Sequence, residues 1–289
     1  MGRLTSHSSV SKMNKHLNIK GKLLSTQRPL IMGILNITPD SFFDGGKYEY
    51  TTEIQKRVRE IVDEGADIID IGAYSSRAGA VDISEEEEWN RLKRGLDVIF
   101  EEYDDAIVSV DTFRSGIATR AIEAGAAIIN DISGGDLDKD MFQTIAQLNV
   151  PYIVMHMQGT PQTMQDNPSY NNTISEIIFD LSKKIDTLRQ YGVKDIIIDP
   201  GFGFGKLPND NYSILNNLEK FTIFELPILV GLSRKSMIYK TIDSTPDNSL
   251  NGTTVLNALA LAKGANILRV HDVREAVECV KLYERCYHS

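Results

Sequence analysis

The chain has 289 residues, enough for one large hydrophobic core, whether divided into two ordinary domains or closed as one barrel. Its hydrophobic (42%) and charged (25%) fractions are those of an ordinary globular protein. The net charge of −9 argues against a general binder of nucleic acids, so any anionic ligand must meet a local cluster of Arg, Lys and His.

The chain termini give weak signals. No apolar run is long enough to cross a membrane, and the N-terminus lacks the hydrophobic core of a signal peptide. We expect residues 1–16 to be a disordered leader or an expression remnant, and residues 17–289 to form one domain. Cys279 and Cys286 have the spacing of one helix face rather than of a metal site or disulfide framework. A reducing, cytoplasmic location with no membrane partner is expected.

Eight short, continuously apolar segments recur along the chain, with amphipathic segments between them. Such runs are typical of parallel strands that are buried on both faces. The predicted strands are Leu30–Asn36, Asp67–Gly72, Ala106–Asp111, Ala127–Asp131, Pro151–His156, Asp195–Asp199, Pro227–Leu232 and Asn266–Val270. The clearest predicted helices are Thr52–Glu64, Glu85–Glu102, Thr173–Tyr191 and Leu250–Lys263. Eight βα units predict an α/β fold, a (β/α)8 TIM barrel in a single domain, with the doubly wound open sheet as the alternative.

Polar or ionisable side chains follow every predicted strand. In a TIM barrel these strand ends surround the active site. In chain order they are Asn36, Ser75–Arg77, Asp111, Asn130 and Asp131, His156, Asp199, Ser233–Lys235, and Arg269 with His271. One such residue would be unremarkable, because a strand end meets water, but eight sets around one mouth indicate a site.

One group of these residues suits the polar edge of a flat heterocycle. Asp111 and Asp199 can accept paired hydrogen bonds from an amino-pyrimidine edge, Asn130 can donate and accept, and Lys235 can donate to a carbonyl or ring nitrogen. Two alternatives stay open from the residues alone. Asp199 and Lys235 can form a structural ion pair, and Asp111 can cap the following helix.

A second group is neutral to cationic and suits a multiply charged anion: Asn36, Arg77, Arg269 and His271. Asn36 can supply one neutral oxygen to Mg²⁺, which takes few protein ligands and completes its coordination with phosphate and water.

Aromatic and sulfur-containing side chains accompany the polar ones. Phe42 lies in the loop after the first strand, Met155 at the end of the fifth, and Phe204 in the glycine-rich DPGFGFGK stretch. Each can cover a planar ligand, although packing in the core is the alternative. Lys235 and Ser236 begin a helix whose backbone N–H groups can bind a carboxylate.

Six motifs occur in a characteristic order: MGILNITPDSFFDGG, VDT, NDISGG, DPGFGFGK, SRKS and RVHD. Together they resemble a bacterial-type, single-function dihydropteroate synthase, from about Leu17 to the last helix. The resemblance implies a transferase of folate biosynthesis. It would condense 7,8-dihydropterin-6-ylmethyl diphosphate with 4-aminobenzoate to give 7,8-dihydropteroate and pyrophosphate.

The resemblance also divides the site residues between the substrates. It assigns the pterin to Asp111, Asn130, Asp199 and Lys235, to which we add Met155 and Phe204 as side chains that can cover the ring. Asp111, Asp199 and Lys235 are expected to be the catalytic residues. The resemblance assigns the diphosphate to Ser76, Arg77, Arg269 and His271, Mg²⁺ to Asn36, and 4-aminobenzoate to Phe42 and Ser236. The dihydropterin would expel pyrophosphate, and the amine would attack the resulting cation, so no side-chain nucleophile is required.

One loop departs from the family pattern. The usual Ser-Thr-Arg-Pro-Gly run is here Ser75-Ser76-Arg77-Ala78-Gly79, so any difference is expected in the aminobenzoate pocket rather than in the reaction. Sulfonamides are expected as inhibitors and a homodimer as the assembly. The alternatives are a methyltetrahydrofolate-binding methyltransferase, a class I aldolase with Lys235 as Schiff base, and a non-catalytic pterin-binding paralogue.

Overall fold

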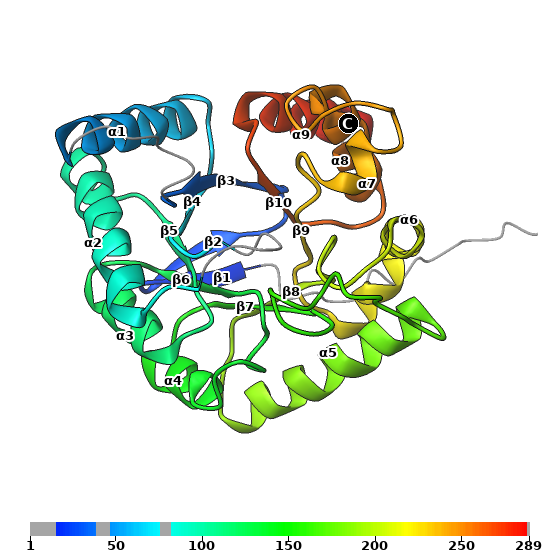
Figure 1. The fold of residues 1–289 in the computed structure, drawn as a ribbon, viewed down its shortest axis with the longest axis horizontal. Coiled ribbons are helices and arrows are strands. Elements are labelled where there is room, and N and C mark those ends of the chain that lie inside the picture. Colours follow the sequence, from blue (N-terminus) through cyan, green and yellow to red (C-terminus); the bar gives the residue numbers. More distant parts are fainter. Residues whose placement is uncertain (1–15, 39–46, 76–81, 288–289) are drawn as a thin grey trace, which may run out of the picture.

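The computed structural model describes residues 16–38, 47–75 and 82–287. Eight parallel strands form a barrel, and the helices surround it (Figure 1). The strands are β3 (Leu30–Asn36), β4 (Ile68–Gly72), β5 (Val108–Asp111), β6 (Ile128–Asp131), β7 (Tyr152–Met155), β8 (Ile196–Asp199), β9 (Leu229–Val230) and β10 (Ile267–Val270). All eight fall within the predicted segments, so the predicted barrel is confirmed and the open sheet is excluded.

The strand order closes the barrel. Consecutive strands pair in parallel from β3 to β8, and β10 pairs with both β3 and β9. A parallel bridge between Ile198 and Ile228 joins β8 to the segment that leads into β9. Because every strand runs in the same direction, all eight C-terminal ends meet at one mouth.

The helices alternate with the strands, as we predicted from the amphipathic segments between the apolar runs. They are α1 (Lys47–Asp63), α2 (Glu85–Glu102), α3 (Ser115–Glu123), α4 (Met141–Leu148), α5 (Thr173–Gln190), α6 (Pro208–Asn216), the 3-10 helix η2 (Leu218–Phe224), α7 (Ser236–Tyr239), α8 (Leu250–Ala262) and α9 (Val273–Tyr287). Side-chain caps fix two starts: Ser84 accepts from the backbone N–H of Glu87, and Asn172 from that of Ser175. Within the described part of the chain, no helix has both the length and the apolar character of a membrane span.

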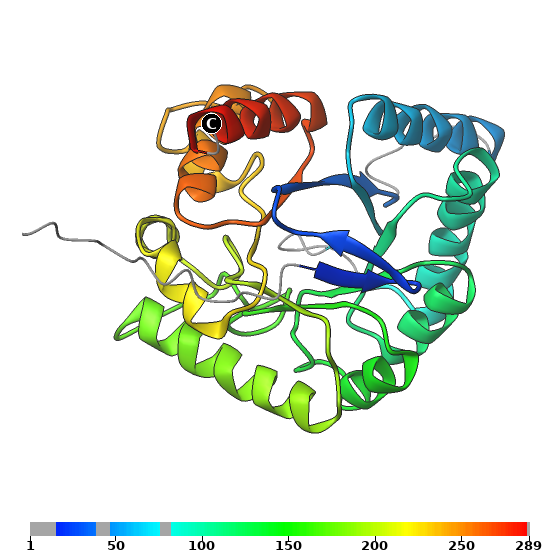
Figure 2. The same ribbon diagram turned by 180° about the vertical axis from the view of Figure 1, so that it is seen from behind.

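An antiparallel hairpin that the sequence did not predict covers the N-terminal end of the barrel (Figure 2). It consists of β1 (His16–Ile19) and β2 (Lys22–Ser25), joined by two residues, Lys20 and Gly21, that both have positive φ. Leu17 and Ile19 pack against the first residues of the barrel strands, so the mouth at the other end is the open one. Of the predicted leader, only His16 lies within the described residues.

Candidate active site

The floor of the mouth is a network of charged and amide side chains centred on Arg269. The guanidinium donates to two carboxylates, from Nε to Asp70 Oδ2 at 2.6 Å and from Nη2 to Asp111 Oδ2 at 2.9 Å. Asn130 Nδ2 lies 3.3 Å from Asp70 Oδ2, so Asp70 contacts two of the predicted site residues. Arg269 thus lies on the floor beside the residues predicted for the pterin.

Burial in this network changes the ionisation of Asp111. The pKa of Asp111 is raised to about 7, chiefly by loss of hydration; Arg269 opposes this shift, and the charges of Asp70 and Asp131 add to it. Burial by itself lowers the pKa of Arg269, but the two adjacent carboxylates raise it, so the guanidinium stays charged. Asp111 does not cap the next helix, since Arg114 is the N-cap of α3.

Asp199 and Lys235 lie on the other side of the floor and form no direct ion pair with each other in the described structure. Asp199 Oδ1 accepts from the backbone N–H of Gly201 at 2.7 Å. Lys235 Nζ donates to the carbonyl of Phe202 and lies 4.6 Å from the centroid of the Phe204 ring. Burial raises the pKa of Asp199 and lowers that of Lys235 to about 8, and each charge partly offsets the shift of the other.

An apolar cluster lines one side of the mouth. Met155 is buried together with Ile132, Met157 and Met164, and the partly buried Phe113 and Phe204 pack against them. Met155 therefore belongs to this small apolar core, and Phe204 packs against the same core. A flat ligand above the polar floor would have this polarizable surface beside it.

His271 and Ser233 form a hydrogen-bonded pair at the ends of β10 and β9. Ser233 Oγ accepts from the backbone N–H of His271 at 3.2 Å and lies 3.0 Å from its Nδ1. Burial, followed by the positive charges of Arg269 and Arg234, lowers the pKa of His271 to about 4, so its ring is neutral at physiological pH. Because the serine hydroxyl is free to donate to Nδ1, the imidazole can present Nε2–H as a donor to an anion.

Arg234 does not share this role. Its guanidinium forms a forked pair with Asp272, with Nη2–Oδ1 at 2.6 Å and Nε–Oδ2 at 3.2 Å. This ion pair connects the loop after β9 to the loop after β10. Lys235 and Ser236, the next two residues, take no part in it. Ser236 is half-buried and is the first residue of α7.

Asn36 ends β3, and its half-buried side chain has no hydrogen-bond partner in the described structure. No group of three or more His, Cys, Asp or Glu side chains that could hold a metal occurs among the described residues. The amide oxygen of Asn36 is available as one neutral ligand. This suits a Mg²⁺ ion that arrives bound to a diphosphate, because such an ion takes most of its ligands from phosphate and water.

Three predicted site residues, Phe42, Ser76 and Arg77, lie outside the described residues. Most of the others are at or next to strand ends, whereas Phe204 is in the loop after β8, Lys235 is in the loop after β9 and Ser236 begins α7. In the floor, Asn130 and Arg269 contact Asp70 directly, and Asp111 joins them through Arg269.

Two buried charged residues near the floor were not predicted from the sequence. Asp70 is fully buried within the apolar strand β4, and an ionisable residue inside such a run was a signal that could have identified it. Lys206 ends the DPGFGFGK stretch and is only 3% exposed. Its ammonium contacts His156. His156 follows a strand, as predicted, but it contacts the loop after β8 instead of forming part of the floor.

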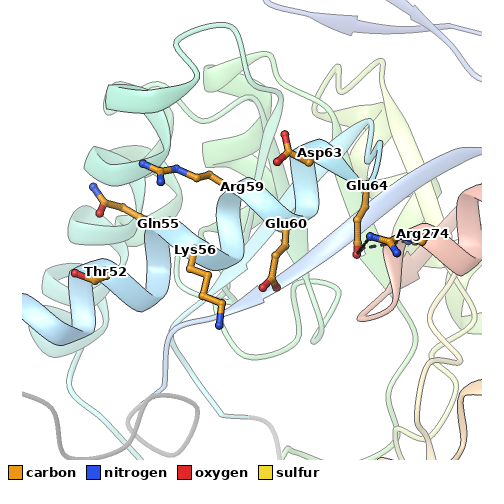
Figure 3. Close-up of a pocket in the computed structure, with 8 residues that line it drawn as sticks. All are labelled: Thr52, Gln55, Lys56, Arg59, Glu60, Asp63, Glu64 and Arg274. Carbon is orange, nitrogen blue, oxygen red and sulfur yellow. Dashed lines mark hydrogen bonds and ion pairs between the residues drawn. The ribbon is translucent and has the colours of Figure 1, made fainter.

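A separate pocket of about 360 Å³ lies on the outer side of α1 (Figure 3). It is lined by Thr52, Gln55, Lys56, Arg59, Glu60, Asp63, Glu64 and Arg274. None of these is a strand-end residue, and the figure shows Glu64 paired with Arg274 at its edge. We do not connect this pocket with the chemistry of the mouth.

Comparisons with known proteins indicate one family. The family model described as pterin binding enzyme matches residues 32–271. A dihydropteroate synthase of Clostridium beijerinckii is 43% identical, over 89% of this chain and 93% of its own. The dihydropteroate synthase of Escherichia coli K12 is 39% identical, over 92% of this chain and 94% of its own.

Solved structures give the same result. The Yersinia pestis dihydropteroate synthase in a sulfonamide drug complex has a TM-score of 0.89 at 36% identity, covering 95% of this chain and 100% of that one. The Xanthomonas albilineans enzyme with 4-aminobenzoic acid has a TM-score of 0.89 at 33% identity, covering 95% and 99%. The same enzyme with 7,8-dihydropteroate has a TM-score of 0.85 at 31% identity, covering 95% and 99%. The chain belongs to the dihydropteroate synthase family of pterin binding enzymes.

Proposed function

We propose that this protein joins 7,8-dihydropterin-6-ylmethyl diphosphate to 4-aminobenzoate, with release of pyrophosphate. The observation that carries the proposal is the floor itself. Two carboxylates, an amide and an ammonium, Asp111, Asp199, Asn130 and Lys235, surround one mouth beside an apolar cluster. This combination matches a flat ring that has an amino-pyrimidine edge and an apolar face.

The pterin is assigned to this floor. Asp199 keeps one carboxylate oxygen on the Gly201 N–H, which orients the carboxylate toward its ligand. Lys235, anchored to the Phe202 carbonyl, donates to the ring carbonyl or a ring nitrogen. Met155 and Phe204 cover the ring faces, and Asn130 completes the polar edge.

Departure of pyrophosphate leaves a cation on the dihydropterin, and the carboxylates of Asp111 and Asp199 stabilise that positive charge. Asp111 and Asp199 are the proposed catalytic residues, together with Lys235. The amine of 4-aminobenzoate then attacks the exocyclic carbon and loses a proton. Positioning and electrostatics supply the catalysis, so Lys235 needs no Schiff base and the aldolase alternative is not adopted.

The leaving diphosphate is assigned to cationic and neutral donors from both the floor and the rim of the mouth. His271 presents Nε2–H, Arg269 contributes its charge, and Ser76 and Arg77 are assigned on the family resemblance. Asn36 would hold Mg²⁺ that arrives with the substrate. When bound, this ion supplies charge neutralisation for the leaving anion.

The 4-aminobenzoate is assigned to Phe42 and Ser236, with Ser236 beside Lys235 at the first turn of α7. The choice of these two residues rests on the family resemblance. Related enzymes solved with 4-aminobenzoic acid and with a sulfonamide drug support 4-aminobenzoate as the second substrate and sulfonamides as the proposed inhibitors.

We further propose a cytoplasmic homodimer built from residues 17–289 as one domain. Both cysteines are free, which suits a reducing compartment. Apolar side chains of α8 and α9 are exposed around a groove of about 470 Å³, including Leu259, Leu282 and Tyr287. A single such patch can serve both subunits across a two-fold axis. Sedimentation equilibrium with Leu282→Glu tests this assembly: the variant is expected to be monomeric.

The activity is tested by pyrophosphate release from the pterin diphosphate with and without 4-aminobenzoate. Release that depends on 4-aminobenzoate and stops in excess chelator supports the proposal. No release in either condition, with the pterin bound, would support the non-catalytic paralogue instead.

A further inference from the structure

The loop after β8 encloses a buried ammonium. Lys206 Nζ lies 2.8 Å from the carbonyl oxygen of Gly201, 2.9 Å from that of Phe204, and 3.1 Å from that of His156. It also lies 3.0 Å from His156 Nδ1. The ammonium therefore joins both ends of the Gly201–Lys206 loop to the end of β7, with backbone and imidazole acceptors in place of a direct carboxylate partner among the described residues.

The backbone of this loop can take its shape only with glycine at Gly201. Gly201 has φ +73°, and a Cβ atom there would lie 1.9 Å from the His156 carbonyl oxygen. In this conformation the Gly201 and Phe204 carbonyls both accept hydrogen bonds from the Lys206 ammonium. Without that charge, buried carbonyl groups would lose their partner, which costs more than a normal hydrogen bond contributes.

The outer side of the same loop holds the pterin floor. The Phe202 carbonyl accepts from Lys235 Nζ, and the Phe204 ring lies against the same ammonium. The Gly201 N–H binds Asp199. Asp199 and Lys235 are therefore both positioned by peptide groups of this loop. Lys206 stabilises the same loop through the Gly201 and Phe204 carbonyls.

His156 is suited to accept from Lys206. Burial, and then the charge of Lys206, lowers the pKa of His156 to about 2, so its ring is neutral and Nδ1 can be an acceptor. Burial also lowers the pKa of Lys206 to about 7, and Asp199 partly offsets this shift. Three N–H donors facing four acceptors favour the charged form over a neutral amine.

We propose that Lys206 is a positioning residue for the pterin half of the reaction, acting through the Gly201–Lys206 loop on Asp199, Lys235 and Phe204. The inference rests on the proposed function, and it adds a residue that touches no substrate. It predicts that loss of the ammonium weakens pterin binding selectively. A lysine that only stabilises the fold would lower the melting temperature and leave the affinity of the folded protein unchanged.

Lys184 supplies a matched control. It is also buried, at 7% exposed, and donates to the Ser133 carbonyl at 3.2 Å and to Asp136 at 2.7 Å. In the described structure, Lys184 contacts neither Asp199 nor Lys235 nor the Gly201–Lys206 loop. Lys206→Met and Lys184→Met each remove one buried ammonium group. Only the ammonium of Lys206 contacts the loop that positions the floor residues.

The test measures the dissociation constant of a pterin analogue by calorimetry, with thermal unfolding and the KM for 4-aminobenzoate on the same samples. Lys206→Met is expected to weaken the pterin analogue at least about tenfold, as for the loss of a hydrogen bond to a charged group. The KM for 4-aminobenzoate is expected to change less than about threefold. Lys184→Met is expected to lower the melting temperature while keeping the wild-type pterin affinity.

Tyr170→Phe covers the case in which Lys206→Met does not fold. The Tyr170 hydroxyl donates to the Gly205 carbonyl at 2.7 Å, so this variant removes one neutral bond to the same loop. A smaller but selective loss of pterin affinity, about threefold, is expected. Wild-type pterin affinity in folded Lys206→Met or in Tyr170→Phe, or an equal loss in Lys184→Met, would overturn the inference. Failure of the wild-type protein to bind the pterin would instead refute the proposed function.

Discussion

The guanidinium of Arg269 is shared between the carboxylates of Asp70 and Asp111, at 2.6 and 2.9 Å. Asp70 is fully buried in β4, whereas Asp111 is at the end of β5. One cation therefore faces two potential anions. The buried partner holds Arg269 in place, and Asp111 is left with a pKa near neutrality.

Removal of the Asp70 charge should change the ionisation of Asp111. The pKa of Asp111 is raised to about 7 chiefly by burial, and Asp70 adds to the shift. In Asp70→Asn that repulsion is gone and Arg269 interacts with Asp111 alone, so the pKa of Asp111 should fall. If pterin binding needs the ionised carboxylate, binding is lost as the pH drops through this pKa. The acid limb of the pH profile of pterin affinity should therefore move to lower pH.

Asp67→Asn is the control for this experiment. Asp67 directly precedes β4 at the opposite end of the barrel, where it pairs with Arg28. It should change stability but leave the acid limb in place, because residues at that end support the fold rather than the site. An unmoved limb in Asp70→Asn would separate Asp70 from the ionisation of Asp111.

Asp199→Asn should weaken pterin binding by about 1.5–3 kcal/mol, the range for hydrogen bonds to charged groups. The amide keeps an acceptor but loses the charge and half of a bidentate pair. Calorimetry with a pterin analogue measures the loss. The control is Asp195→Asn, just before the same strand, which should bind the pterin normally. Among the described residues, the Asp195 side chain accepts only from the Asn18 N–H, at 3.3 Å. Unchanged affinity in Asp199→Asn would make that residue structural.

Ser233→Ala should weaken the interaction with pyrophosphate. The hydroxyl lies 3.0 Å from His271 Nδ1, and without it the imidazole loses the bond that directs Nε2–H outward. A rise of about three- to tenfold in the inhibition constant of pyrophosphate is expected, corresponding to one neutral hydrogen bond.

The control for Ser233→Ala is Ser249→Ala, which removes another buried hydroxyl that donates to the Pro246 carbonyl at 2.7 Å. Equal effects of the two substitutions on pyrophosphate inhibition would show that Ser233 acts through general stability.

Gly201→Ala and Gly192→Ala should differ sharply in stability. Both positions have positive φ, +73° and +89°, so both substitutions are strained, by about 1–2 kcal/mol. Only at Gly201 would the new Cβ meet a backbone atom, the His156 carbonyl oxygen at 1.9 Å, while Gly192 has open space around it. Urea unfolding should show the larger loss for Gly201→Ala, by more than about 2 kcal/mol. Equal losses would mean that the loop can move away from β7.

The sequence predicted those parts of the fold that rest on local patterns. Buried parallel strands such as Leu30–Asn36 are continuous apolar runs, and the polar residues that interrupt them mark the mouth. The β1–β2 hairpin was missed because its two strands are four residues each and only Leu17 and Ile19 are buried. Its stability comes from the barrel end on which it packs, and this contact is not visible in a short window of sequence.

The site was predictable in its members but not in its contacts. Asp111, Asn130 and Arg269 could be named from strand ends. Asp70, the common partner of Asn130 and Arg269, lies inside a strand, where a carboxylate was not expected. Lys206 could be read as part of a motif, but its ring of carbonyl acceptors forms only when the loop folds back on β7. Such contacts depend on the tertiary structure rather than on neighbouring residues.

The most direct measurement is product formation from both substrates. The purified protein is mixed with 7,8-dihydropterin-6-ylmethyl diphosphate, 4-aminobenzoate and Mg²⁺, and 7,8-dihydropteroate and pyrophosphate are quantified together by mass spectrometry and a coupled assay. We expect the two products in equal amounts, with strongly reduced rates in Asp199→Asn and in Lys235→Met. Pyrophosphate without dihydropteroate, or neither product from a folded protein that binds the pterin, would contradict the proposed function.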